Sequence, residues 1–332
     1  MPFVKNKDKR RFLYIIGIFV GVACRRFKIM EKAVFFMIRT DLAEELRTHA
    51  MASRAKHAKG ELDGILYNER TEDFIRISTI EITDERGEEA LGKPKGKYVT
   101  ISFPSAANLT YADFLKLCDA VAVELRAFCW DFSHALVCGI GNRDLSSDAL
   151  GAIAADHVLV THHLKQMDGI PLGMGGFGDV SAFAPGSMAK TGLETAAIVH
   201  SVVENVHPDV VIAVDALAAR EADRLARTIQ ISDTGIAPGS GVGNVRSALN
   251  RETVGVPVVA IGVPTVVDTA TLLRDALEGC SPNEEIIASL SGLFVAPKEI
   301  DAIAENMGKV IGYAINRTLH GDFPYEEMAM MV

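Results

Sequence analysis

Hydrophobic and polar residues alternate in the first third of the chain, as they do in strands that bury one face. The alternation covers residues 73–83, and a second run with strand character covers residues 98–103. Residues 84–97 between them are charged and contain several glycines, which predicts an exposed connection. We therefore expect a small N-terminal β-hairpin region, preceded by a polar helix over residues 41–58.

From residue 135 onward, short apolar runs alternate with helical stretches. The run Val-Val-Ile-Ala-Val at residues 210–214 is typical of a strand that is buried on both faces in a parallel sheet. The alternation predicts βαβ units and an α/β fold, with a mainly parallel, doubly wound sheet and flanking helices. The predicted strands cover residues 135–140, 180–183, 210–214, 228–231 and 258–263. The predicted helices of this part cover residues 148–164, 192–206, 217–226, 269–277 and 298–319, and a further helix is predicted before it over residues 109–130.

The composition is that of a globular protein with a large core. Of the 332 residues, 48% are hydrophobic and 23% are charged, and the net charge is −9. A protein whose main role is to grip phosphate backbones needs a clustered positive surface, so we expect no direct nucleic acid partner. The five cysteines form no Cys-x-x-Cys pair, which favours a reducing, cytoplasmic compartment.

Residues 1–29 differ from the rest of the chain. Eight Lys or Arg residues stand against one Asp in residues 1–28, and they flank an apolar run over residues 12–24. That run is shorter than the roughly 20 residues of a membrane-spanning helix, and no small-x-small cleavage site follows it. We expect no membrane association. We interpret residues 1–29 as an extension that results from an incorrect upstream start, with the native translation start at Met30 or Met37. An export or anchor role for these residues is the alternative.

Two aspartates occupy the positions where open α/β sheets collect their chemistry, beyond the carboxyl ends of the strands. Asp215 directly follows the predicted strand 210–214, and Asp148 lies in the first turn of the helix after the strand 135–140. Repulsion between neighbouring carboxylates keeps one of them protonated, which suits acid/base hydrolysis. We therefore expect Asp148 and Asp215 to be the catalytic pair, although Asp148 as a helix cap and Asp215 as a structural acid remain alternatives. Further candidates for a catalytic acid are Asp144, Asp233 and Asp268.

A polar loop rich in glycine, residues 232–244, follows the predicted strand 228–231. Its many backbone amides and small side chains allow a substrate to approach closely and offer donors to an oxyanion. The candidate residues of this substrate loop are Asp233, Thr234, Gly235, Gly239, Ser240, Gly241 and Asn244. The loop has neither a dinucleotide fingerprint nor a Gly-Lys-Ser/Thr pattern, and no histidine occurs in residues 208–319. We therefore expect no cofactor and no metal.

Several long blocks of sequence, in the same order, resemble the germination protease family of spore-forming bacteria. The blocks are residues 38–43, 137–142, 148–151, 184–186, 212–220, 228–235, 238–244 and 262–268. The resemblance extends from about residue 38 to residue 320 and implies a fold related to that of hydrogenase-maturation proteases. It also implies an endopeptidase of the spore cytoplasm, a homotetramer made as a self-processing zymogen, which degrades small acid-soluble spore proteins.

The resemblance carries over to individual residues. It implies that the two essential aspartates are Asp148 and Asp215, and that the propeptide junction lies between Asp41 and Leu42. Residues 30–41 would then be the propeptide and residues 42–332 a single protease domain. An acidic residue before the cut calls for local donors. The basic candidates for that role are Arg143, Lys190, Arg220 and Arg246.

One departure from the family bears on the mechanism. Other members carry a histidine where this chain has Ala237, and the related hydrogenase-maturation proteases hold a metal with two acids and a histidine, so a metal-dependent mechanism is weakened here. Two alternatives stay open. The first is a metallo-endopeptidase that uses the same acids, and the second is a non-catalytic α/β module that binds a small anion at its glycine loops.

Overall fold

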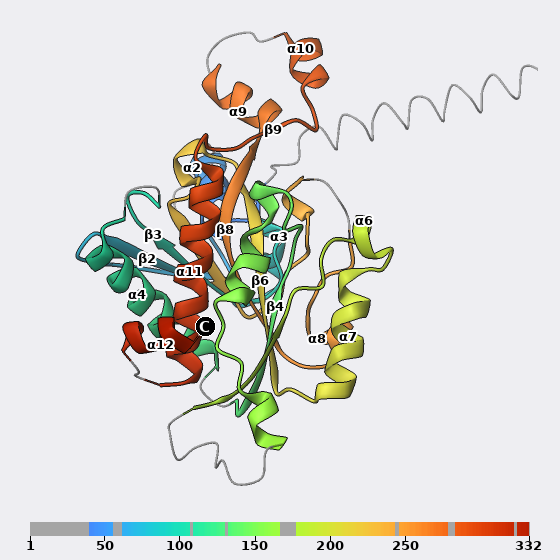
Figure 1. Ribbon diagram of the computed structural model, residues 1–332. Helices are drawn as coiled ribbons and strands as arrows, with labels where there is room; N and C mark the ends of the chain where they lie inside the picture. The colour runs from blue at the N-terminus through green and yellow to red at the C-terminus, as the bar shows by residue number, and fades with distance from the viewer. Residues whose placement is uncertain are drawn as a thin grey trace, which may run out of the picture. The chain divides into compact units, whose positions relative to one another are not determined.

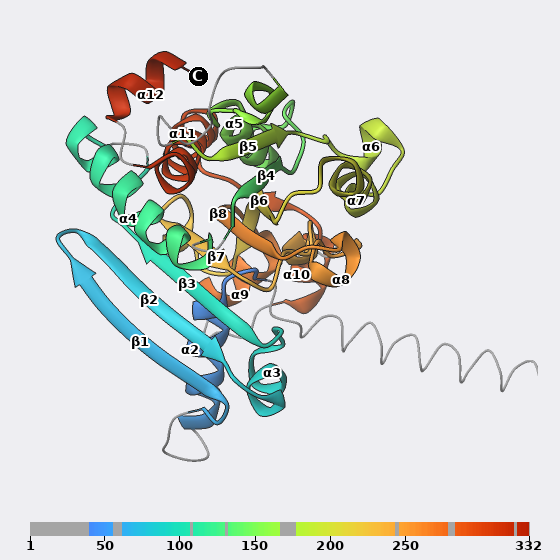
Figure 2. The ribbon, with the colours of Figure 1, turned by 90° about the horizontal axis from the view of Figure 1, so that it is seen from below.

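A mixed sheet with helices on both faces forms the centre of the protein (Figures 1 and 2). The computed structural model describes residues 40–55, 62–106, 109–129, 132–166, 177–242, 246–277, 283–321 and 324–331. Within these residues the strand order is β1-β2-β3-β7-β8-β6-β4-β5, and β9 pairs with β8. The predicted α/β class is confirmed. Predictions that concern residues 1–39 and Asn244 lie outside the described residues.

The predicted hairpin forms and belongs to the main sheet. Its strands pair antiparallel, with Ile77 opposite Ile101, and the second strand continues the ladder to β7. A further strand at the outer edge was not predicted, because only its first residue, Ile65, is buried and no apolar alternation marks it. The elements of this half are β1 (Ile65–Glu72), β2 (Ile75–Ile82), α3 (Glu85–Leu91), β3 (Gly96–Ser102) and β7 (Thr228–Ser232).

Four strands form the parallel half of the sheet, as the continuous apolar runs predicted. They are β4 (His134–Gly139), β5 (Asp179–Phe183), β6 (Val210–Ala219) and β8 (Val258–Asp268). Every residue of β4 is buried, and Ala216 is the only residue of β6 that is not. The strand β7 pairs antiparallel with β8, so the parallel and antiparallel halves meet between these two strands.

Helices cover the two faces of the sheet with separate apolar clusters. One face packs against α4 (Tyr111–Cys129), α5 (Leu150–Asp156) and α11 (Ile300–Leu319), with Val121, Ile311 and Val214 in one cluster. The other face packs against α7 (Thr195–Val206), α8 (Arg251–Val254) and, over the hairpin, α2 (Ala43–Ala55). The smaller elements are α6 (Met188–Thr191), α9 (Thr269–Ala276), α10 (Glu284–Ser289), β9 (Phe294–Val295) and α12 (Tyr325–Met331).

One predicted helix is absent and a second is shorter than predicted. Residues 217–226 are not a helix, because β6 continues to Ala219 and a short 3₁₀ turn, Ala222–Arg224, follows. Residues 148–164 form a 3₁₀ turn, the short helix α5 and a second 3₁₀ turn, His162–Gln166. Pairing with the long strand β8 outweighs the helix propensity of the alanine-rich run after Asp215.

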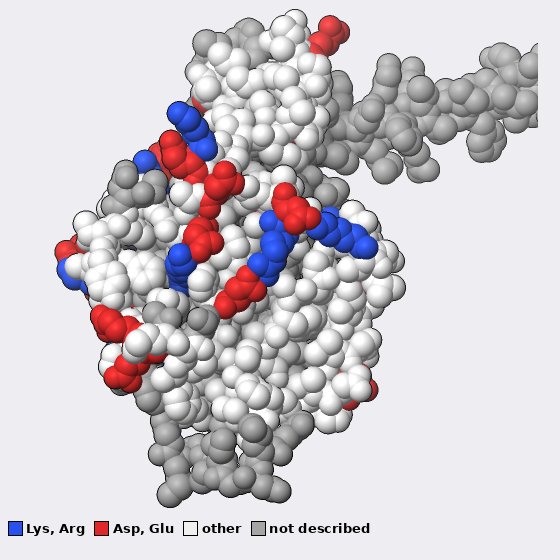
Figure 3. All heavy atoms as spheres, in the orientation of Figure 1, with Lys and Arg blue, Asp and Glu red and all other residues white. Residues whose placement is uncertain are grey.

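Charged side chains are mixed on the face seen in Figure 3, where basic groups lie beside acidic groups. Ion pairs of this kind join Arg143 to Asp156 and Lys309 to Glu305. Of the helices in the described residues, none combines the length and apolar character that crossing a membrane requires.

Candidate active site

Asp215 lies within β6 and not beyond its end, which corrects the predicted position. The neighbouring strand β4 stops at Gly139, opposite Val214, so Asp215 is the first residue of β6 past that partner. On the other side Gly262 of β8 stands opposite Asp215. The Asp215 side chain remains buried, with 5% of the residue exposed. A carboxylate is therefore set into the sheet at the point where one neighbouring strand has ended.

Asp148 reaches the same region from the loop that follows β4. It ends the 3₁₀ turn Ser146–Asp148, directly before α5, and its Oδ2 accepts a hydrogen bond of 2.8 Å from the backbone N–H of Asn142. Gly141 has a φ of 108°, and a Cβ atom there would lie 2.1 Å from the Asp148 carbonyl oxygen. The loop can fold back this tightly because residue 141 is glycine.

The pKa values of both acids are raised, and the charge of Asp148 contributes to the shift at Asp215. Burial raises the pKa of Asp215 well above its usual value, and the charges of Asp148 and Asp41 raise it further. Burial also raises the pKa of Asp148, against a hydrogen bond from Asn142. The positive charge of Arg246 lowers the pKa of both acids. The predicted pair therefore shares one electrostatic site in which a proton is easily held.

Asp41 is bound next to this pair, along the last residues of β6. Its backbone N–H donates to the Ala218 carbonyl at 2.9 Å, and its Oδ2 accepts from the Ala218 N–H at 2.8 Å. The Ser240 hydroxyl donates to Asp41 Oδ1 at 2.7 Å. After it, the side chain of Leu42 is fully buried against Leu217. The predicted junction thus lies in the same region of the molecule as the two predicted catalytic acids.

The carbonyl oxygen of Asp41 has two side-chain donors that sequence reasoning missed. Lys93 Nζ lies 2.8 Å from it, and Gln230 Nε2 lies 2.9 Å from it. Gln230 comes from β7, whereas Lys93 follows the C-terminal glycine of α3. No local sequence motif marks either residue, so their contact with the Asp41 carbonyl oxygen is visible only in the folded structure.

Three of the four basic candidates for binding the acidic residue are engaged elsewhere, which corrects that prediction. Arg143 pairs with Asp156, Lys190 with Asp144 and Arg220 with Asp275. The Asp41 carboxylate is bound instead by the uncharged donors Ser240 and the Ala218 N–H. Arg246 acts through its charge on Asp148 and Asp215.

The predicted substrate loop lines a cavity of about 250 Å³ beside Asp41. The loop contributes Thr234, Gly235 and Ser240 to the lining, which also includes Lys93 and Gln230. A Cβ atom on Gly241 would lie 2.3 Å from Asp41 Oδ2, so glycine allows the aspartate to approach. Gly239 has a φ of 74°, as expected of a turn that glycine favours.

The three further candidate acids form contacts with groups outside the predicted catalytic pair. Asp144 is exposed and pairs with Lys190. Asp233 is exposed, and its Oδ1 accepts from the Lys97 N–H at 2.8 Å. Asp268 caps α9, where it accepts from the Thr271 N–H at 2.9 Å.

Comparison with known proteins identifies the family of this chain. The sequence model of the family described as germination protease matches residues 42–280. The chain belongs to the germination protease family. Members of this family are peptidases, so the chain is an enzyme that hydrolyses peptide bonds.

Relatives that carry the name germination protease match most of the chain. The protein of Caldanaerobacter subterraneus subsp. tengcongensis is 40% identical over 330 residues, which cover 89% of this chain and 98% of the relative. That of Priestia megaterium is 35% identical over 356 residues, with 88% and 96% covered. That of Bacillus subtilis is 43% identical over 248 residues, with 73% and 67% covered. A solved [NiFe] hydrogenase maturation protease from Thermococcus kodakarensis aligns with a TM-score of 0.33 and 21% identity, over 58% of this chain and 98% of that one.

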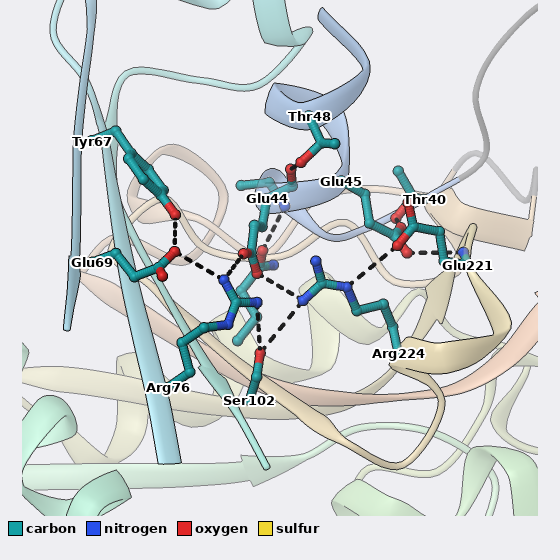
Figure 4. Close-up of polar contacts among 12 residues, drawn as sticks. Thr40, Glu44, Glu45, Thr48, Tyr67, Glu69, Arg76, Ser102, Glu221 and Arg224 are labelled. Carbon is teal, nitrogen blue, oxygen red and sulfur yellow. Dashed lines mark hydrogen bonds and ion pairs between the residues drawn. The ribbon is translucent and has the colours of Figure 1, made fainter. Parts of the chain in front are cut away.

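A buried polar network holds the residues around the predicted junction of this germination protease family member (Figure 4). The Thr40 hydroxyl donates to Glu45, which also accepts the backbone N–H groups of Arg220 and Glu221 at 2.8 and 2.9 Å. A second set of contacts, from Glu44, reaches Arg76 of β2 at 2.7 Å and Arg224 at 2.9 Å. Both flanks of the Asp41–Leu42 bond are therefore fixed to the sheet.

One group of side chains in the described residues has the composition of a metal site, and it lies apart from the acids. It consists of His134, His162 and Asp179, at the starts of β4 and β5 and in the turn His162–Gln166. His162 Nδ1 lies 2.8 Å from Asp179 Oδ1, and the two imidazole rings stack at 4.4 Å. Asp148 follows the opposite end of β4, so this group is not part of the predicted catalytic pair.

Proposed function

We propose that this peptidase begins the degradation of small acid-soluble spore proteins during germination, and that it is made as a zymogen that cuts itself between Asp41 and Leu42. The observation that carries the proposal is the binding of Asp41 to Ala218 of β6, the strand that also carries the buried Asp215. Burial raises the pKa of both Asp148 and Asp215, which supports it. Membership of the germination protease family supports the substrate. The family match also begins at Leu42, the first residue after the proposed cut.

In the proposed mechanism the two acids share one proton and activate a water molecule. Asp215, which is the more deeply buried, holds the proton, whereas Asp148 is ionised and accepts a proton from the attacking water. The water oxygen forms a bond to the carbonyl carbon, and the C–N bond then breaks. Asp215 donates its proton to the leaving amine, so the products are a free carboxyl group and a free amine.

The proposal also covers the compartment, the oligomeric state and the domain boundaries of the enzyme. We place it in the spore cytoplasm, as a homotetramer in which residues 30–41 are the propeptide and residues 42–332 the protease domain. A solution mass of about four chains, measured by sedimentation of the full chain, is the expected result; a mass of one chain would contradict the homotetramer.

The test is cleavage of a purified small acid-soluble spore protein by the full chain and by Asp148→Asn and Asp215→Asn. Positioned acids and bases contribute about 10²- to 10⁴-fold to a rate, so each variant should lose at least 10²-fold. Mass spectrometry of the products should show cuts after Glu or Asp. The control Asp144→Asn changes an exposed acid of the same loop and should cleave at the parental rate.

Three results would contradict this proposal. Parental activity in Asp215→Asn would remove the acid pair from the mechanism. Activity that is lost with a chelator and restored by a metal ion would favour the metallo-endopeptidase that uses the same acids. Stabilisation by a small anion without cleavage at any pH would favour the non-catalytic binding module.

A further inference from the structure

We propose that Lys93 and Gln230 bind the carbonyl oxygen of the bond that is cut and stabilise the negative charge that develops on it, both at the chain's own junction and in substrates. The proposal rests on cleavage between Asp41 and Leu42 as stated above. It replaces the expectation that backbone amides of the substrate loop supply the oxyanion donors.

The contacts to the Asp41 carbonyl have the geometry of an oxyanion site. Lys93 Nζ and Gln230 Nε2 lie 2.8 and 2.9 Å from the ground-state carbonyl oxygen, the atom on which the oxyanion forms. The other polar groups of Asp41 bind different partners, because its N–H and carboxylate contact Ala218 and Ser240. The two donors are thus directed at the carbonyl alone.

The Gln230 side chain forms hydrogen bonds to the backbone on both sides of the Asp41–Leu42 bond. Its Oε1 accepts a hydrogen bond of 2.7 Å from the Ala43 N–H, while its Nε2 donates to the Asp41 carbonyl. Since a backbone N–H can only donate, the Ala43 contact fixes the orientation of the amide and directs Nε2 at Asp41. One side chain therefore binds the residue before the cut and the second residue after it.

Lys93 adds a positive charge to the same point. Its Nζ lies 5.9 Å from the centre of the Tyr98 ring, which closes one side of the cavity. Burial lowers the pKa of Lys93, whereas the Asp41 carboxylate raises it. An ammonium group removed from bulk water interacts strongly with a developing oxyanion because solvent screens it less.

The sheet places these donors on the same face as the proposed acid. Gln230 stands opposite Gly262 in the β7–β8 ladder, and Gly262 stands opposite Asp215 in the β8–β6 ladder. Residues directly opposite each other project to one face, so Gln230 and Asp215 project together with a glycine between them. Their Cα atoms are two strand spacings, about 10 Å, apart. Position 262 contributes no side chain between them, and the side chain of Leu217 lies over Gly262, where an added Cβ would be 2.8 Å from its Cγ.

The test compares Lys93→Met and Gln230→Leu with the parent on a purified small acid-soluble spore protein. Loss of one oxyanion donor costs about 10²- to 10³-fold in kcat, so each variant should show that loss while KM changes little. Lys95→Met is the control, because this exposed lysine lies two positions from Lys93 and should leave kcat unchanged. Should Gln230→Leu not fold, Gln230→Glu tests the same contact with a side chain of equal size and carries the same expected loss.

A second readout separates charge stabilisation from support of the fold. A phosphinic peptide with Glu before the phosphinate imitates the charged intermediate, whereas the product peptide that ends in Glu does not contain it. We expect both variants to lose about 10²-fold in affinity for the phosphinic peptide and to retain affinity for the product peptide. Parental kcat in both variants, or equal losses for the two peptides, would overturn the assignment. If the parent itself does not cleave, the proposed function fails instead.

Discussion

Asp215 is an ionisable side chain in the middle of a buried strand, and its ionisation is costly there. Burial disfavours the charged form and raises the pKa from 3.8, and the nearby charge of Asp148 acts in the same direction. A structural role would be served by an uncharged side chain. This loss of stability is explained if catalysis needs a carboxyl group that stays protonated at a higher pH than an exposed aspartate does.

The variant Asp215→Asn should therefore be more stable than the parent at neutral pH. As the pH rises from 3.8 through the raised pKa of the folded protein, the folded state binds more protons than the unfolded state, so the free energy of unfolding falls. Asparagine carries no charge that must be buried, so we expect the free energy of unfolding of Asp215→Asn to exceed that of the parent at pH 7.5.

Thermal unfolding at pH 4 and pH 7.5 measures this effect. The difference in stability between the two pH values should shrink in Asp215→Asn and persist in Asp223→Asn, which changes an exposed acid. An Asn variant that is less stable than the parent at pH 7.5 would show that the carboxylate of Asp215 stabilises the fold.

At this scale the sequence located the acids but not the groups that bind the carbonyl. Asp148 follows the apolar residues of β4 and Asp215 follows the first five apolar residues of β6, and such local patterns can be read along the chain. Lys93 and Gln230 lie 52 and 189 residues from Asp41 and meet it only through the pairing of strands. No pattern near either residue contains that information.

At the scale of the elements, long-range strand pairing determines the secondary structure of segments whose local sequence pattern does not predict it. The alanine-rich residues after Asp215 favour a helix by propensity, but β8 supplies a partner as far as Ala219, and the strand continues. Polar β1 has one buried residue and exists because β2 offers a full antiparallel ladder. Helices with a clear apolar face, such as α11, lie where they were predicted.

The helix α2 shows how an element with little apolar surface is fixed. Its residue Glu44 is 4% exposed and pairs with Arg76 and Arg224 (Figure 4). Glu44→Ala leaves both guanidinium groups without this partner. Breaking a buried pair costs about 3–5 kcal/mol, and because both arginines are partly exposed we expect about 2–3 kcal/mol.

Denaturant unfolding measures this cost, with Glu204→Ala as the control. Glu204 is exposed on α7, and its replacement should change stability by less than about 0.5 kcal/mol. Equal effects of the two substitutions would mean that the ion pairs of Glu44 do not hold α2 in place.

For the whole molecule, the important feature is that one sheet joins both halves. The hairpin was predicted as a region added to the protease fold, but β3 pairs with β7 and makes it continuous with the parallel strands. Lys93 and Gln230 come from the antiparallel half, whereas Asp148 and Asp215 come from the parallel half. The α/β class could be predicted from alternating elements, but the order of the strands could not, because it depends on contacts between distant segments.

Intact mass spectrometry of the full chain over time, beside Asp215→Asn, tests the central claim most directly. The parent should lose the mass of residues 1–41 by a cut between Asp41 and Leu42, and Asp215→Asn should keep its full mass under the same conditions. Loss of the same segment from Asp215→Asn at the parental rate, or a first cut of the parent at another bond, would contradict the account.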